Sequence, residues 1–119
     1  MNWNIEFFSE FESEFDLLSE SVQDTCLAHL KLLSEFGPSL KRPHVDTLNG
    51  SKHSNMKELR FNADNGVWRL AFAFDPSRKA ILLVGGDKSG GSSNAFYKKL
   101  IKKADARFNK HLSTIDNER

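Results

Sequence analysis

The sequence predicts one α+β domain over residues 1–119, with an N-terminal strand and helical hairpin, an antiparallel β-meander and a C-terminal helix. Three observations predict this fold. Residues 56–88 contain three strand-like runs joined by two short turns, which is typical of a meander. Residues 9–36 and 93–112, on either side of it, carry apolar side chains at helical spacing. The length fits a single domain with its own core, and we expect residues 116–119 to form a frayed tail.

The N-terminal segment is expected to form a strand and then helical structure. Residues 3–7 alternate apolar and polar side chains, as a half-buried strand does. Ser9 is expected to cap the first helix, with Glu12 as its capping-box partner. A second helix should start near Ser19 or Ser21. Whether it is separate from the first, as in a hairpin, or continues it as one bent helix stays open.

The second helix has a clear apolar face and a clear end. The side chains expected on that face are Val22, Cys26, Leu27, Leu30 and Leu33. Gly37-Pro38 is expected to stop the helix. Residues 37–55 have little pattern, and a loop of this length in a small domain is usually functional or mobile. Its basic side chains are Lys41, Arg42, His44, Lys52 and His53.

The meander divides its side chains between two faces. The face expected to form the core under the helices carries Trp68, Leu70, Phe72 and Phe74. A shallower face carries Val67, Arg69, Ala71 and Ala73. Residues 81–84 are apolar on both faces, so we place their strand in the interior of the sheet. Ser93 or Asn94 is expected to cap a last helix of roughly 16–20 residues.

Composition sets limits on the function. Net charge is +1, but residues 1–36 hold eight acids and one lysine (−7), whereas the rest of the chain holds 16 basic and eight acidic residues (+8). This asymmetry hints at an anionic partner for the basic part. A single cysteine, no apolar run of about 18 residues and no secretion signal lead us to expect a cytoplasmic protein.

Several kinds of site are not supported by the sequence. The histidines and the cysteine are too scattered to form a metal site, and His29 and His111 are expected on helix surfaces. Residues 85–90 lack the Gly-Lys-Ser/Thr order of a nucleotide-binding loop. A Ser-His-Asp triad has no elbow motif to anchor it. We therefore expect no metal and no cofactor.

A basic and polar cluster remains, which consists of Lys57, Arg60, Arg69, Lys88, Tyr97 and Lys98. Such side chains can hold an RNA backbone, stack a base and stabilise a phosphorane. Other interpretations stay open. Arg69 could form a salt bridge with Glu58, Tyr97 could be partly buried beside Phe96, and the lysines of the last helix could form a solvated face.

The chain also resembles the HigB-type branch of the RelE/ParE toxin superfamily over residues 3–112. The resemblance is carried, in this order, by Glu58-Leu59-Arg60, Trp68-Arg69-Leu70, the run from Phe74 to Leu83, Gly86-Asp87-Lys88, Phe96-Tyr97 and Ala104-Asp105. It implies a small α+β fold, ribosome-dependent mRNA cleavage and neutralisation by a small antitoxin, often a helix-turn-helix protein encoded next door.

The resemblance also implies roles for individual residues. Arg69 matches an arginine that contacts the scissile phosphate, and Arg60, Lys88 and Tyr97 match further basic and aromatic site residues. RelE has lysines for acid–base work where this chain has Met56 and Glu58. Proton transfer is therefore assigned to His53, Asp87 or Lys88. The side chains expected to bind RNA are Lys52, Lys57, Lys98 and Asp87.

The leading hypothesis is a type II toxin that cleaves mRNA on the ribosome without a metal ion and so inhibits translation. One alternative is a non-enzymatic, ParE-like toxin or regulator that binds a protein such as gyrase. Another is a decayed toxin that binds its antitoxin and nothing else.

Overall fold

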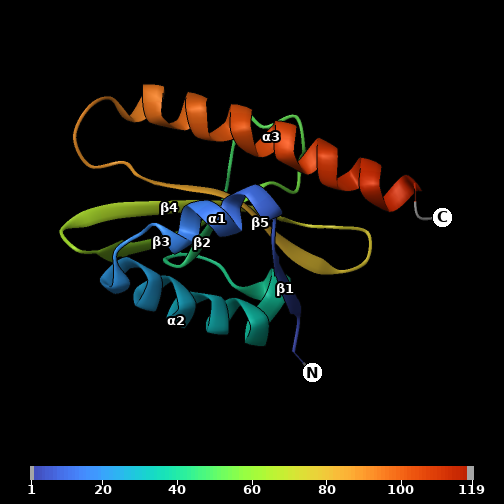
Figure 1. The fold of residues 1–119 in the computed structure, drawn as a ribbon, viewed down its shortest axis with the longest axis horizontal. Helices are drawn as coiled ribbons and strands as arrows, with labels where there is room; N and C mark the ends of the chain where they lie inside the picture. Colours follow the sequence, from blue (N-terminus) through green and yellow to red (C-terminus); the bar gives the residue numbers. More distant parts are fainter. Residues whose placement is uncertain (1, 118–119) are drawn as a thin grey trace.

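The computed structural model describes residues 2–117 and contains five strands and three helices (Figure 1). In chain order these are β1 (Asn4–Phe7), α1 (Ser9–Asp16), α2 (Glu20–Phe36), the 3-10 turn η1 (Gly37–Ser39), β2 (Val45–Thr47), β3 (Lys57–Ala63), β4 (Gly66–Phe74), β5 (Lys79–Asp87) and α3 (Ser93–Asn117). The predicted α+β fold, with its N-terminal strand and helical hairpin, meander and C-terminal helix, is confirmed.

The sheet has the strand order β1-β5-β4-β3-β2. Strands β3, β4 and β5 form the predicted antiparallel meander, and β1 adds in parallel to β5. The edge strand β2 was not predicted. It lies within the loop expected at 37–55 and pairs with β3 over three residues, which is too short to show an alternating pattern.

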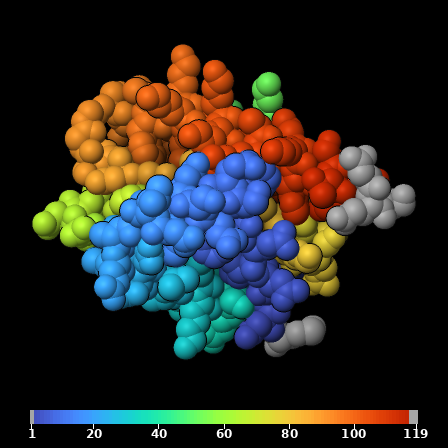
Figure 2. Space-filling model, viewed as in Figure 1, coloured from blue at the N-terminus to red at the C-terminus, as the bar shows by residue number. Residues whose placement is uncertain are grey.

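Helices cover both faces of the sheet. In Figure 1, α3 lies above the sheet and α2 below it. The space-filling view in Figure 2 shows α1, in blue, seated in front between these two helices. Buried side chains of α2 are Val22, Cys26, Leu30 and Leu33. The prediction for Leu27 is wrong, because this side chain is 49% exposed on the outer side of the helix.

The ends of the helices follow from local capping. Ser19 caps α2 by accepting the Val22 N–H at 3.3 Å, so α1 and α2 are separate helices. Gly37 ends α2 with φ +54°, as predicted. The prediction for Ser9 is wrong. Phe8 holds the cap position, because its N–H still bonds to Leu82 as the chain leaves β1.

Helix α3 has 25 residues and is longer than the sequence predicted. Residues 118 and 119 of the expected tail lie outside the part of the chain that the structure describes. None of the helices formed by residues 2–117 is both long and apolar enough to cross a membrane. Within the same residues, no group of three or more His, Cys, Asp or Glu side chains is arranged to hold a metal ion.

Candidate functional site

Two arginines lie side by side on the face of the sheet that α3 covers. Arg60 of β3 and Arg69 of β4 are direct partners in the register of the two strands. Like charges directly opposite each other destabilise a strand pair unless something compensates them. Glu58, two residues before Arg60 on the same face, supplies that compensation. Its Oε2 lies 3.1 Å from Arg60 Nη1, and its Oε1 lies 3.6 Å from Arg69 Nε.

Tyr97 brings α3 into contact with this group. Its hydroxyl donates to Glu58 Oε1 at 2.8 Å and accepts from Arg69 Nε at 3.2 Å. Burial, and then the hydrogen bond to Glu58, raise the pKa of the Tyr97 phenol above its usual value. The phenol therefore stays protonated at neutral pH and acts as a hydrogen-bond donor.

Both alternative interpretations of these residues hold in the free protein. Arg69 forms the ion pair with Glu58 and is buried, with 6% of its surface exposed. Tyr97 is partly buried with its ring 5.4 Å from that of Phe96. The guanidinium of Arg60 is more open, since its side chain is 25% exposed.

Lys88 completes what we call the arginine cluster, which consists of Glu58, Arg60, Arg69, Lys88 and Tyr97. Its ammonium lies 5.7 Å from the centre of the Tyr97 ring, within the range of a cation–π contact. The cluster contains three cations and one carboxylate, so its net charge is 3 − 1 = +2. The structure thus brings together four of the five residues expected to be catalytic. Lys98 is exposed on α3 next to Tyr97.

His53 does not lie with them. Its Nε2 is 2.8 Å from Asn109 Oδ1, and its ring packs 4.9 Å from that of Phe108. Asn109 is twelve residues beyond Tyr97 on α3, which corresponds to about 18 Å along the helix. Lys52 lies beside His53, and its backbone N–H donates to Asp105. The loop that carries both residues is therefore anchored to the second half of α3, at Asp105 and Asn109.

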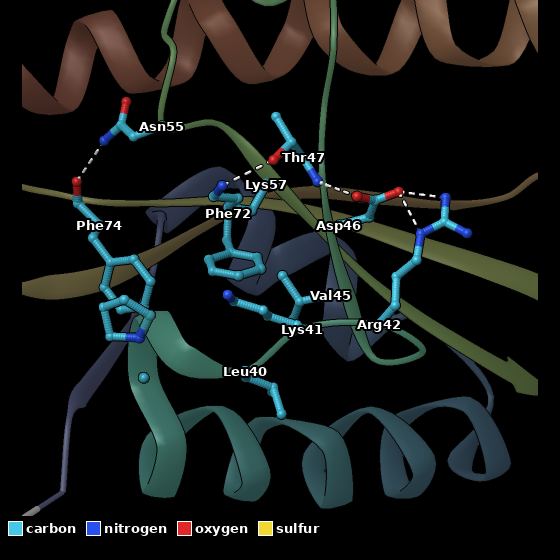
Figure 3. Close-up of a pocket in the computed structure, with 12 residues that line it drawn as sticks. Leu40, Lys41, Arg42, Val45, Asp46, Thr47, Asn55, Lys57, Phe72 and Phe74 are labelled. Carbon is cyan, nitrogen blue, oxygen red and sulfur yellow. Dashed lines mark hydrogen bonds and ion pairs between the residues drawn. The ribbon is translucent and has the colours of Figure 1, made fainter.

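Lys57 and Asp87 also make contacts outside the cluster. Lys57 points to the opposite face of β3, where its Nζ donates to Thr47 at 2.9 Å. Figure 3 shows this bond at the edge of a cavity of about 590 Å³, with Phe72 and Phe74 among its walls. Asp87 accepts from the backbone N–H groups of Val67 and Ser89, each at 2.9 Å. Hydrogen bonds from the side chain and backbone of Ser89 hold the pKa of Asp87 below its usual value.

The structure adds a hollow that was not predicted. It has a volume of about 300 Å³, and its lining residues are His29, Pro43, His44, Arg60, Phe61, Asn62 and Arg69. His29 was expected on a helix surface, which is wrong because its ring packs against His44 and Phe61. A signal was present in the sequence: His29 continues the stripe of Val22, Cys26 and Leu33 on the buried side of α2.

His111 is also not a free surface residue. Its Nε2 lies 2.8 Å from Asp75 Oδ2, in the turn between β4 and β5. The Asp75 side chain is 1% exposed, so this contact ties the second half of α3 to the sheet. His111 therefore has a structural role.

Comparison with known proteins identifies one matching family and two similar proteins. The family described as phage-derived, Gp49-like proteins (DUF891) matches residues 13–109. A Mycobacterium tuberculosis protein named provisionally as toxin HigB2 is 41% identical over 101 residues, 84% of this chain and 50% of that protein. The chain thus spans half the length of this curated relative. Another protein of that organism, named provisionally as toxin HigB3, is 41% identical over 105 residues, 88% of this chain and 90% of that protein.

A solved structure shares the fold. It is that of the Escherichia coli toxin RelE, a variant with two arginines replaced by alanine, in the free state. Its TM-score is 0.58 at 13% sequence identity, and the match covers 87% of this chain and 97% of that chain. At this identity the likeness concerns the fold alone.

Proposed function

The chain belongs to the family of phage-derived, Gp49-like proteins, and from this membership we propose that it is the toxin of a type II toxin–antitoxin system. The resemblance to HigB-type relatives is confirmed by this family and by the two relatives named as HigB toxins. The partner of such a toxin is a small antitoxin, which we propose to be a helix-turn-helix protein encoded beside it. The toxin acts in the cytoplasm, where its ribosome and mRNA partners are.

We propose further that the protein is an endoribonuclease that cleaves mRNA on the ribosome without a metal ion. The observation that carries this proposal is the direct pairing of Arg60 with Arg69. Guanidinium groups bind phosphate oxygens bidentately and stay charged at all relevant pH values. The 2′-hydroxyl of the RNA attacks its own phosphate, and two arginines stabilise the charge that builds up on the phosphorane. The P–O5′ bond then breaks, leaving a 2′,3′-cyclic phosphate and a 5′-hydroxyl.

Glu58 is the group we assign as general base. It contacts both arginines in the free protein, so a phosphate that binds there competes with its carboxylate for the same donors. Binding therefore frees a carboxylate next to the RNA, where it can accept the 2′-hydroxyl proton. The Tyr97 hydroxyl stays hydrogen-bonded to Glu58 Oε1 and orients the carboxylate. His53 is unsuited to this step because its Nε2 bonds to Asn109, twelve residues beyond Tyr97 on α3.

Expression of the protein without its antitoxin tests the proposal. The wild-type protein should arrest growth and create new mRNA 5′ ends at codons in the ribosomal A site. Arg69→Ala should lower cleavage by at least about 10²-fold, the loss typical of a removed donor to a developing anion. Arg78→Ala, which changes an exposed arginine in the turn between β4 and β5, is the matched control and should remain toxic. Toxicity retained by Arg69→Ala would remove Arg69 from the site.

One observation favours a second candidate function. Arg69 is buried and already satisfied by Glu58, Tyr97 and the Trp68 carbonyl, as it would be in a protein that uses it for stability alone. Such a protein would act by binding, either on a target such as gyrase or on its antitoxin alone. Inhibition of DNA supercoiling by the purified protein, with intact mRNA in the same cells, would favour this function.

A further inference from the structure

The hollow beside the arginine cluster contains two histidines that the reaction so far leaves without a role. His29 comes from α2, and His44 lies just before β2. Strand β2 pairs with β3 from Lys57 to Leu59 and no further. One residue further along β3, the Arg60 N–H donates to the His44 carbonyl at 2.8 Å. His44 therefore lies along the edge of β3, although β2 itself begins only at Val45. The sheet edge therefore opens into the hollow at Arg60.

His29 is held in one orientation with one nitrogen available. Its Nδ1 lies 2.9 Å from the Thr25 carbonyl oxygen. Because a carbonyl only accepts hydrogen bonds, Nδ1 carries the hydrogen, and Nε2 is the nitrogen available to a bound ligand. The ring is fixed by Phe61 at 5.4 Å and by the His44 ring at 5.5 Å. A rigid imidazole on a helix with a free Nε2 is suited to proton transfer.

Side chains able to transfer protons approach the arginines from both faces of the sheet. Glu58 meets Arg60 and Arg69 together with Tyr97 of α3. His29 belongs to α2, on the other face, and lines the same hollow as the two arginines at the sheet edge. In-line displacement at phosphorus has the attacking and leaving oxygens on opposite sides. An acid and a base for this reaction therefore have to flank the phosphate.

We propose that His29 is the general acid of RNA cleavage, and this inference rests on the proposed function. Glu58 takes the proton of the 2′-hydroxyl, the 2′-oxygen forms its bond to phosphorus, and the P–O5′ bond breaks. The 5′-oxygen takes the proton from His29 Nε2 and leaves as a hydroxyl. Glu58 ends protonated and His29 neutral, and exchange with water restores both. His44 is a positioning residue that holds the His29 ring.

The size of the hollow agrees with this role. Its volume of about 300 Å³ is at the small end of the range for small-molecule pockets. One nucleoside fits such a space, and the nucleoside that carries the leaving 5′-oxygen is the one that His29 has to reach.

A change of leaving group tests His29 directly. Single-turnover cleavage is measured on ribosomes that hold either an all-oxygen mRNA or one with sulfur in place of the bridging 5′-oxygen. A thiolate leaves without a proton because thiols are far more acidic than alcohols. His29→Gln should lose about 10²-fold on the oxygen substrate and keep nearly the wild-type rate on the sulfur substrate. If His29→Gln fails to fold, as judged by thermal unfolding, His29→Asn takes its place.

The outcomes separate this inference from the proposed function. His53→Gln changes a histidine of the loop before β3 that contacts Asn109 instead of the hollow, and it should keep wild-type rates on both substrates. Equal losses on both substrates would mean that His29 is structural, and an unchanged rate on the oxygen substrate would mean that it is not needed. Either result overturns the inference while cleavage by the wild type upholds the proposed function. A wild-type protein that cleaves neither substrate would overturn both.

Discussion

Replacement of Glu58 by glutamine separates substrate binding from catalysis. The side chains have the same shape, and the amide oxygen can still accept the Tyr97 hydroxyl that now lies 2.8 Å from Oε1. The change removes the negative charge that faces Arg60 at 3.1 Å and Arg69 at 3.6 Å. Because Glu58 is 4% exposed, water has little access to this position and does not screen the arginine charges in place of the lost carboxylate. The net charge of the arginine cluster rises from +2 to +3.

The magnitudes follow from this geometry. A phosphate bound to both arginines would lie about 6 Å from the Glu58 carboxylate, where Coulomb repulsion at an effective dielectric constant of 20 is about 3 kcal/mol at most. Screening by salt at the open side of Arg60 reduces this, so we expect RNA to bind Glu58→Gln about tenfold more tightly. Cleavage should fall by about 10²–10⁴-fold because the general base is lost. The free energy of unfolding should fall by about 3 kcal/mol, the low end for one removed partner of a buried pair.

Three assays check these values on one preparation. Affinity is measured on ribosomes that carry mRNA with a 2′-deoxy nucleotide at the cleavage site, which blocks attack. Cleavage is measured on the normal mRNA, and stability is measured by denaturant unfolding. Tighter binding together with lost cleavage is the expected pair of results. Weaker binding, or cleavage at the wild-type rate, would refute the assignment of Glu58 as the base beside the phosphate.

Further predictions concern parts of the fold outside the cluster. Arg107→Ala should lower the free energy of unfolding by about 1–3 kcal/mol, because Arg107 donates to the Leu83 carbonyl at 2.7 Å and to both Glu14 oxygens; an unchanged denaturation midpoint would contradict this. The hydrogen bond from Arg107 lowers the Glu14 pKa below 4.5, so its stabilising effect is present above about pH 4.5 and is lost as the pH falls through the lowered value. Wild type should therefore lose more stability than Arg107→Ala between pH 5 and about pH 3 in acid titrations of unfolding. Burial raises the Cys26 pKa to about 12, so a thiol reagent at pH 8 should label the native protein far more slowly than the unfolded one; equal rates would contradict the buried position.

Local patterns in the sequence predicted much of the fold. Alternation along β4 assigned Arg69 to the face of the two alanines, and the same rule assigned Arg60 to that face of β3. Ser19 and Gly37 marked the ends of α2, because capping depends on residues close in sequence. The pairing of Arg60 with Arg69 could therefore be anticipated from strand parity and a short turn.

Contacts between distant segments could not be predicted in this way. Ser51 bonds to Asp105 at 2.5 Å across 54 residues, and this contact takes His53 away from the arginines although it precedes β3 by only a few residues. The hollow depends on α2 crossing the sheet so that His29 meets His44. The periodicity of α2 shows that His29 is on its inner side, but it does not show which strand lies opposite.

The chemical ends of the RNA products test the central claim most directly. Purified protein is added to ribosomes that translate a defined mRNA, and the new ends are identified. The arginine-stabilised attack of the 2′-hydroxyl predicts 5′-hydroxyl and 2′,3′-cyclic phosphate ends with the wild type, and none with the Arg60→Ala/Arg69→Ala double variant. Intact mRNA with the wild type, 5′-phosphate ends, or equal cleavage by the double variant would contradict it.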